Sequence, residues 1–286
     1  MNIAVTGCKG QLGNEMRKIA LTNALHHWFF TDIDELDITD STAVERFFDN
    51  NHIDCCVNCA AYTAVDRAED DVNTAEQVNI HASRVLAEAC HSHHALLIHV
   101  STDYVFDGKG TRPYKETDTP RPVSVYGKTK LAGEQAIQDS GCFYCIVRTA
   151  WLYSSTGKNF VKTMLSLADT HKDVNVVSDQ HGSPTYAGDL AQVIMALISH
   201  YGNQPVHEVF HFTNEGITSW DVFAKAIFDL AGKPCKVNSI TTDQYPTRAT
   251  RPAYSALDTS KLKETLSIRI PFWKDSLERC IKELNA

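Results

Sequence analysis

The sequence predicts an α/β protein that is built on a doubly wound parallel sheet and carries a smaller C-terminal α/β lobe. Strand-like and helix-like stretches alternate through the first two-thirds of the 286 residues, which is typical of a parallel sheet with helices on both faces. A glycine-rich turn at 6–13 also follows the apolar run at 3–5. Strand, glycine turn and helix in this order indicate a Rossmann-like start.

In the first 61 residues, apolar runs predict strands over 2–6 and 28–32, a short strand ending at 36–38, and a central strand over 55–61. A helix is expected after Gly13, with Met16 and Ile19 on its inner face. Ser41 or Thr42 is expected to cap a second helix that extends through Phe48.

The same rhythm continues to residue 148. Its expected elements are a helix over 78–90, a strand over 95–101, a helix over 126–138 and a strand over 144–148. Beyond Trp151 it loosens, and proline-bearing loops occur at 182–185 and 245–252. We therefore expect a dinucleotide-binding domain over 1–150, which also receives a segment near 185–215. Residues 151–286 should mainly form a substrate-binding lobe.

Composition narrows the class of protein. A formal net charge of −8 argues against a nucleic-acid partner, and no apolar run approaches the ~18 residues of a membrane span. Nine scattered cysteines predict reduced thiols in a cytoplasm. Cys56 and Cys59 have CxxC spacing, but they fall in a predicted buried strand without a second ligand pair. The histidine-rich stretch at 91–94 is expected to be a solvated turn rather than a metal site.

The glycine turn predicts a dinucleotide site. Its glycines are spaced GxxGxxG, at Gly7, Gly10 and Gly13. They allow a sharp turn, bring backbone N–H groups to a pyrophosphate and let the next helix pack closely. Asp32 follows Gly13 by 19 residues and could accept a hydrogen bond from a ribose hydroxyl, which favours NADH; it could equally be a solvated acid. Lys9 or Arg17 could assist a 2′-phosphate, so NADPH and NADH both stay open.

Tyr126 and Lys130 predict carbonyl chemistry, because residues at i and i+4 share one face of a helix. The tyrosine could donate a proton to a ketone oxygen, and the lysine ammonium could lower the tyrosine pKa. Thr102 follows a predicted strand and could hydrogen-bond the same oxygen. The alternative for the Tyr–Lys pair alone is an exposed helix pair.

Together these residues resemble the extended short-chain dehydrogenase/reductase family. Longer segments are similar to dTDP-4-dehydrorhamnose reductases and span nearly the whole chain; they lie at 60–66, 101–108, 126–134, 148–153 and 251–257. The resemblance implies NADPH- or NADH-dependent reduction of the C4 ketone of dTDP-4-dehydro-L-rhamnose to dTDP-L-rhamnose. This is the last step of dTDP-rhamnose biosynthesis, which serves polysaccharide synthesis.

The resemblance also implies roles for individual residues. The catalytic set is Thr102, Tyr126 and Lys130. The cofactor residues, beside the glycines and Asp32, are Gln11 and Leu12 for pyrophosphate, Asp37 and Ile38 for adenine, and Ala60, Ala61 and Thr63 for the nicotinamide half, with Tyr126 and Lys130. The sugar pocket is expected to contain Asp103, Tyr104 and Trp151, with Lys158, Asn159 and Gln180 as further candidates. Arg248 and Arg251 are candidates for the diphosphate because an arginine fork matches phosphate oxygens.

A bound Mg²⁺ at a dimer interface is a further implication of the resemblance. Glu15 matches a carboxylate ligand, and Asp189 and Glu283 are possible companions. Asp189 stands where a glutamate is expected, and carboxylates on helices are commonly just solvated. Monomer and homodimer both stay open.

Other functions share the same motifs. An epimerase or dehydratase of another nucleotide-4-keto sugar would use the same tyrosine and lysine, and a non-catalytic regulatory subunit of methionine adenosyltransferase has the same fold. Dehydratases carry acidic residues beside the catalytic threonine, whereas here Tyr104 follows Asp103. This difference favours a simple reductase.

Overall fold

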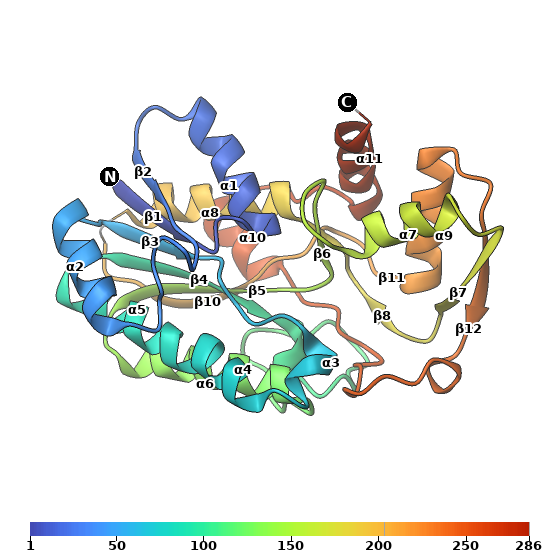
Figure 1. Cartoon of the computed structure of the whole chain (residues 1–286), viewed down its shortest axis with the longest axis horizontal. Helices are drawn as coiled ribbons and strands as arrows, with labels where there is room; N and C mark the ends of the chain where they lie inside the picture. Colours follow the sequence, from blue (N-terminus) through green and yellow to red (C-terminus); the bar gives the residue numbers. More distant parts are fainter. Residues whose placement is uncertain (203, 286) are drawn as a thin grey trace.

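The computed structural model describes residues 1–202 and 204–285, and its centre is a six-stranded sheet (Figure 1). The spatial order is β10-β5-β4-β3-β1-β2, and every neighbouring pair is parallel. The strands are β1 (Asn2–Thr6), β2 (His27–Phe30), β3 (Cys55–Asn58), β4 (Leu96–Thr102), β5 (Phe143–Thr149) and β10 (His207–His211). The predicted fold class is confirmed. The order reverses between β1 and β3, which is where ligands bind in such sheets.

Two layers of helices cover the sheet (Figure 1). One layer consists of α1 (Gln11–Thr22), α8 (Ala187–Tyr201) and α10 (Ser260–Leu266). The other consists of α2 (Ser41–Asn51), α5 (Ala82–Ser92) and α6 (Val125–Asp139). Successive β1 residues serve opposite layers, because Ile3 packs with Met16 of α1, whereas Ala4 packs with Phe48 of α2.

Three local expectations were wrong. Residues 36–38 are not a strand but part of a turn, in which Leu36 N–H donates to Asp32 O; the buried Leu36 side chain produced the apolar signal. Asp40, rather than Ser41 or Thr42, caps α2, because its carboxylate accepts from the backbone N–H groups of residues 42 and 43. The central strand β3 ends at Asn58, before residue 61.

The helix expected at 78–90 is longer and irregular. It runs through α4 (Val72–Glu76), a π turn (Gln77–His81) and α5, while the short α3 (Val65–Ala68) precedes it. Two 3₁₀ turns complete this inventory of short helices, at Asp103–Val105 and Thr242–Gln244.

The remaining elements form the smaller lobe, beside one end of the sheet (Figure 1). Its helices are α7 (Phe160–Ala168), α9 (Trp220–Ala231) and α11 (Trp273–Leu284). Its strands pair in parallel as β7 (Asp173–Val177) with β12 (Lys236–Ile240) and β6 (Leu152–Tyr153) with β9 (Thr185–Tyr186), and antiparallel as β8 (His181–Gly182) with β11 (Thr218–Ser219). Buried aromatic and aliphatic side chains such as Phe223, Trp273 and Leu277 form its core. No described helix combines the length and apolarity needed to cross a bilayer.

Candidate active site

The β1–α1 turn packs so closely that two of its glycines have no room for a side chain. A Cβ on Gly7, whose φ is +62°, would lie 2.7 Å from Ala60 Cα. A Cβ on Gly13 would lie 2.5 Å from both Cys8 Cα and Gly7 O. Gly10 differs, since its nearest contact would be Gly7 O at 3.2 Å. The N-terminal backbone of α1 is therefore held against the sheet with its Gly10 side open, as an anion site requires.

A cavity of about 630 Å³ opens beside this turn at the carboxyl ends of the strands. All three predicted catalytic residues line it: Thr102, Tyr126 and Lys130. Predicted cofactor residues in the same wall are Gly10, Gln11, Leu12, Ala61 and Thr63. Predicted sugar-pocket residues there are Asp103, Tyr104, Trp151, Lys158 and Asn159. Gly10 and Asn159, which are 149 positions apart in the chain, thus line the same cavity.

A second cavity, of about 410 Å³, adjoins the first across the glycine turn. Both cavities are lined by Lys9, Gly10, Cys59 and Ala61. The second also contains the predicted adenosine residues Asp32, Asp37 and Ile38, together with Gly7 and Ala60. Two joined cavities across the switch point fit an extended dinucleotide, and the side-chain-free glycine cradle fits its pyrophosphate.

Sequence reasoning missed several lining residues. Cys59, Val65 and Val78 line the cavities although none of them was predicted as a site residue. For Cys59 the available signal was its position just after a central strand. Some predicted site residues do not line either cavity. Gly13 lies beneath the turn, and Gln180, Arg248 and Arg251 also lie outside both linings.

The two arginines are engaged elsewhere. Arg251 donates 3.1 Å to the Tyr104 hydroxyl and forms an ion pair with Asp66. Arg248 pairs with Asp70 at 2.6 Å. Tyr104 lines the larger cavity, so Arg251 stands directly behind its wall, whereas Arg248 pairs on the surface.

Tyr126 is a buried acid. Its side chain is 8% exposed, and burial raises its pKa well above the usual value, which the nearby Thr102 hydroxyl partly opposes. The Tyr104 ring meets it edge-on, with 5.4 Å between ring centroids. The phenol therefore stays protonated at neutral pH and has a proton to give.

Asp103 lies next to Thr102 with an incompletely satisfied carboxyl. Its Oδ1 accepts from the Thr102 hydroxyl at 2.9 Å, whereas its buried Oδ2 has no hydrogen-bond partner among the described residues. Burial raises the pKa of Asp103 to about 6. The Thr102 and Ser255 hydroxyls partly oppose this shift.

Lys130 contacts strand β4 from helix α6. Its Nζ donates to Val100 O at 2.8 Å and lies 3.2 Å from His99 Nε2. Burial lowers the pKa of Lys130 to about 8, against the opposing charge of Glu134. The prediction that its charge tunes Tyr126 stays a prediction.

A buried ion pair fixes α6 to the sheet. Glu134 accepts from Arg148 of β5 at 2.6 and 2.9 Å and from the Ser101 hydroxyl of β4 at 2.5 Å. Glycines allow the close approach: a Cβ on Gly127 would lie 2.2 Å from Tyr104 O, and one on Gly133 would lie 2.1 Å from Asn79 O. Tyr126 and Lys130 therefore lie on a helix that is held against β4 and β5 by buried side-chain contacts.

The smaller lobe supplies the opposite wall. Trp151 has a φ of +49° and stacks on Trp220 with 3.6 Å between ring centroids. Asn159 donates to Gln11 Oε1 at 2.9 Å, so it joins the lobe to the glycine turn.

The predicted Mg²⁺ ligands do not fit a metal site. Lys18 bridges Glu15 and Glu283, and Glu15 also accepts from a serine hydroxyl. The carboxylate of Asp189 is paired with Arg279 at 2.6 Å and accepts from two further side chains. Because protein cations neutralise these carboxylates, we derive no role for Mg²⁺ here.

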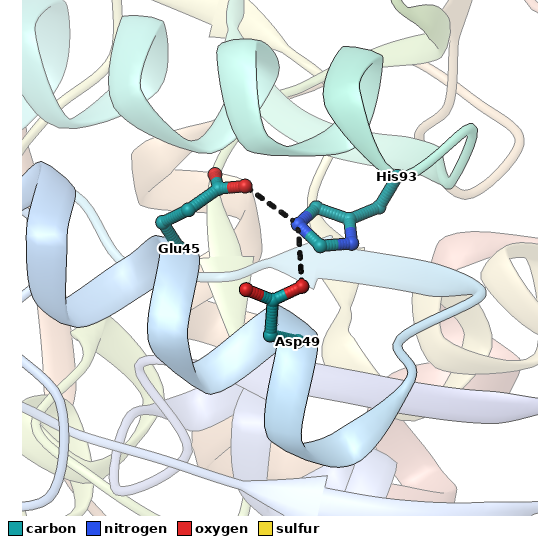
Figure 2. A group of neighbouring side chains, drawn as sticks. All are labelled: Glu45, Asp49 and His93. Carbon is teal, nitrogen blue, oxygen red and sulfur yellow. Dashed lines mark hydrogen bonds and ion pairs between the residues drawn. The ribbon is translucent and has the colours of Figure 1, made fainter.

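The histidine-rich stretch at 91–94 contributes one group of potential ligands, shown in Figure 2. His93 Nε2 lies 2.8 Å from Glu45 and 3.8 Å from Asp49 of α2. Both carboxylates are exposed, and the contact between His93 and Glu45 joins the end of α5 to α2. The CxxC cysteines are free thiols, and burial raises the pKa of Cys59.

Comparison with known proteins decides the family. The model of the RmlD substrate binding domain family matches residues 1–286. The chain belongs to this family. It is 41% identical over 284 residues to the dTDP-4-dehydrorhamnose reductase of Aggregatibacter actinomycetemcomitans, covering 96% of this chain and 97% of that protein.

Solved structures from the family agree. A dTDP-4-dehydrorhamnose reductase from Clostridium acetobutylicum is 42% identical, with a TM-score of 0.94 and 100% coverage of both chains. One from Bacillus anthracis, solved in complex with NADP, is 36% identical, with a TM-score of 0.94 and 99% coverage of both chains. The RmlD-type fold therefore holds across the whole described chain.

Proposed function

We propose that this RmlD-family protein reduces the C4 ketone of dTDP-4-dehydro-L-rhamnose to dTDP-L-rhamnose, using NADPH or NADH. The observation that carries the proposal is the single cavity that contains Thr102, Tyr126 and Lys130 and continues past the glycine turn into the adenosine cavity. Full-length similarity to reductases supports the substrate.

Each side of the cavity has a task in this reaction. The bound cofactor supplies a hydride for the carbonyl carbon. Tyr126 gives its phenolic proton to the ketone oxygen, so the product is an alcohol and solvent restores the proton. Thr102 hydrogen-bonds the same oxygen and holds it beside the phenol. Trp151 and Asp103 line the part of the cavity that would hold the sugar.

Cofactor choice depends on the adenosine end. Asp32 accepts from Lys9 N at 2.9 Å, and Lys9 Nζ is held by Asp34 at 2.6 Å and Glu35 at 3.3 Å. A 2′-phosphate would have to compete with these carboxylates for the lysine, whereas a ribose hydroxyl would not. Asp32→Ala is expected to reduce kcat/KM for NADH more than for NADPH. Equal losses with both cofactors would remove Asp32 as a selectivity residue.

The decisive experiment follows the reduced-nicotinamide absorbance when the protein meets enzymatically generated dTDP-4-dehydro-L-rhamnose. Stoichiometric oxidation of NADPH or NADH, with dTDP-L-rhamnose as product, is expected. Epimerised sugar without net oxidation would instead identify an epimerase. Intact cofactor binding without any turnover would point to a different keto sugar or to a regulatory subunit.

We also infer the cellular compartment and the kind of partner. Nine free cysteines suit a reducing cytoplasm, and the net charge of −8 disfavours a nucleic-acid partner. Monomer and homodimer both fit the proposed chemistry, because the cavity is complete within one chain. Light scattering would distinguish them.

A further inference from the structure

Beneath the cavity lies a buried chain of polar side chains that the reaction above does not use. Asn58 ends β3, His99 lies within β4 and Lys130 lies on α6, and each is 1% exposed. Asn58 Nδ2 is 3.0 Å from His99 Nδ1, and His99 Nε2 is 3.2 Å from Lys130 Nζ. The imidazole therefore separates the asparagine from the predicted catalytic lysine.

Neighbouring backbone fixes the direction of this chain. Asn58 Oδ1 accepts from Ala60 N at 3.1 Å and from the Thr6 hydroxyl at 2.7 Å. A backbone N–H can only donate, so the amide oxygen must face Ala60 and the Nδ2 group must face the histidine. His99 Nδ1 is thus an acceptor without a proton, and a neutral His99 carries its proton on Nε2.

That Nε2–H points at Lys130. An ammonium has only N–H groups to present, so two donors would meet across 3.2 Å. A neutral amine has a lone pair that accepts from Nε2–H, while one of its own N–H groups donates to Val100 O at 2.8 Å. A further N–H remains for the cavity, which Lys130 lines.

We propose that His99 is a positioning residue that favours the neutral amine form of Lys130 in the cofactor-free protein by donating Nε2–H to Nζ. The charge assignment stands on these contacts alone, and only its consequence for turnover rests on the proposed function. As a neutral amine, Lys130 can accept a proton from solvent when negative charge develops on Tyr126. Its ionisation then becomes part of the pH dependence of the reaction.

The other ionisable groups around Lys130 are compatible with this assignment. Glu134 is the nearest opposing charge, but Arg148 already neutralises it. Burial keeps Cys59 and Tyr126 in their neutral forms. Burial lowers the pKa of His99 far below its usual value, so an imidazolium is not formed. Burial lowers the pKa of Lys130 to about 8, so the ammonium is still the larger fraction at pH 7 and the neutral amine predominates above about pH 8.

The test is made on the unmodified protein by NMR. Long-range ¹H–¹⁵N spectra of ¹⁵N-histidine-labelled protein should show His99 as the Nε2–H tautomer, assigned by its loss in His99→Gln. The Cε resonance of ¹³C-labelled Lys130, assigned with Lys130→Met, should titrate with a midpoint near the pKa of about 8. An Nδ1–H tautomer, or a Lys130 that stays protonated up to its ordinary pKa, would overturn the proposal.

A variant supplies the second arm. His99→Gln can turn an amide oxygen toward the ammonium, so the Lys130 midpoint should rise by about one pH unit or more. The pH–rate profile should move in the same direction. His207→Gln, on the edge strand β10, should leave the midpoint unchanged. An unshifted midpoint in folded His99→Gln would contradict the proposal, while loss of turnover alone would bear only on the proposed function.

Discussion

At the scale of single residues, burial decides the chemistry of this cavity. The same loss of water keeps Tyr126 protonated, raises the pKa of Asp103 to about 6 and lowers that of Lys130 to about 8. Burial disfavours whichever form is charged. Asp103 and Lys130 are both still mainly charged at pH 7, but each changes its charge within about one pH unit of neutrality, so each can take part in a proton transfer.

Tyr126→Phe should remove the proton donor and keep the aromatic ring. Because Tyr126 is also a predicted cofactor residue, cofactor binding is measured alongside turnover. We expect kcat to fall by roughly 10²- to 10⁴-fold, with the NADPH dissociation constant changed little. A steady-state assay measures kcat, and a fluorescence titration with NADPH measures the dissociation constant. Near-normal turnover in a variant that binds cofactor would show that Tyr126 is not the donor.

Asp103→Asn should stabilise the protein at neutral pH. The pKa of the folded carboxyl is about 6 against a reference value of 3.8, so both states are protonated below about pH 4 and the folded state carries no penalty there. Between about pH 4 and pH 6 the unfolded chain loses this proton while the folded protein keeps it, so the penalty on folding accumulates in this range and stays constant above it. The cost grows to about 3 kcal/mol, from about two units at 1.36 kcal/mol each.

Urea unfolding at neutral pH and near pH 4 tests this expectation. The unfolding free energy gained by Asp103→Asn should be large at neutral pH and small near pH 4. Asp107→Asn is the matched control with the opposite sign. Hydrogen bonds from Lys109 N and the Tyr114 hydroxyl hold the pKa of Asp107 below its usual value. That substitution should lower stability at neutral pH. A pH-independent effect of Asp103→Asn would refute the argument.

At the scale of elements, close approach of backbone positions the site. The β1–α1 turn lies on the loop after β3, and α6 lies on the turn after β4, because glycines at the contacts carry no side chain. The π turn at Gln77–His81 is one such contact, since Asn79 O faces Gly133.

Gly13→Ala and Gly10→Ala should separate packing from ligand binding. Alanine usually favours a helix by up to ~1 kcal/mol over glycine, but at Gly13 its Cβ would meet backbone atoms at 2.5 Å. We expect the clash to outweigh the gain in helix propensity and to lower the free energy of unfolding by roughly 1–3 kcal/mol, as measured by denaturant unfolding. At Gly10 a Cβ would lie 3.2 Å from Gly7 O, a tight contact that a shift of a few tenths of an ångström would relieve, so Gly10→Ala should cost less stability than Gly13→Ala while weakening NADPH binding. A fully stable Gly13→Ala would contradict the role given to that glycine.

At the scale of the whole molecule, the cavity lies between the sheet and the smaller lobe. Trp151 and Asn159 on one side face the glycine turn and Tyr126 on the other. Side-chain contacts such as Asn159–Gln11 and Arg251–Asp66 already join the two parts. Ligands that fill the cavity should therefore stabilise both parts together.

Bound NADPH should raise the free energy of unfolding by about 2.7 kcal/mol at a free concentration 100 times its dissociation constant. Calorimetry should show one transition that moves upward as a unit. Tyr126→Phe should respond like the unmodified protein, because the phenol acts on substrate. Separate transitions, of which only one responds, would show that the lobes unfold independently.

Much of this architecture was predictable because its signals are local. Alternating apolar runs and helix periodicity depend on neighbours a few residues apart, and they located β1, α1, β4, α6 and β5 correctly. The glycine turn and the Tyr126–Lys130 spacing indicated a nucleotide and a carbonyl reaction in the same way. The strand predicted to end at 36–38 was wrong, because the one buried side chain of Leu36 in a turn produces the same apolar signal as a strand end.

The sequence by itself determined the α/β class, the glycine turn after the first strand and the spacing of the predicted catalytic residues. Only the tertiary structure decided their electrostatic state and partners. It placed Lys18 between Glu15 and Glu283, drew Arg251 to Asp66 and set His99 against Lys130. These contacts join residues far apart in the chain, and their energies depend on burial and on which donor faces which acceptor. Neither quantity exists until the chain has packed.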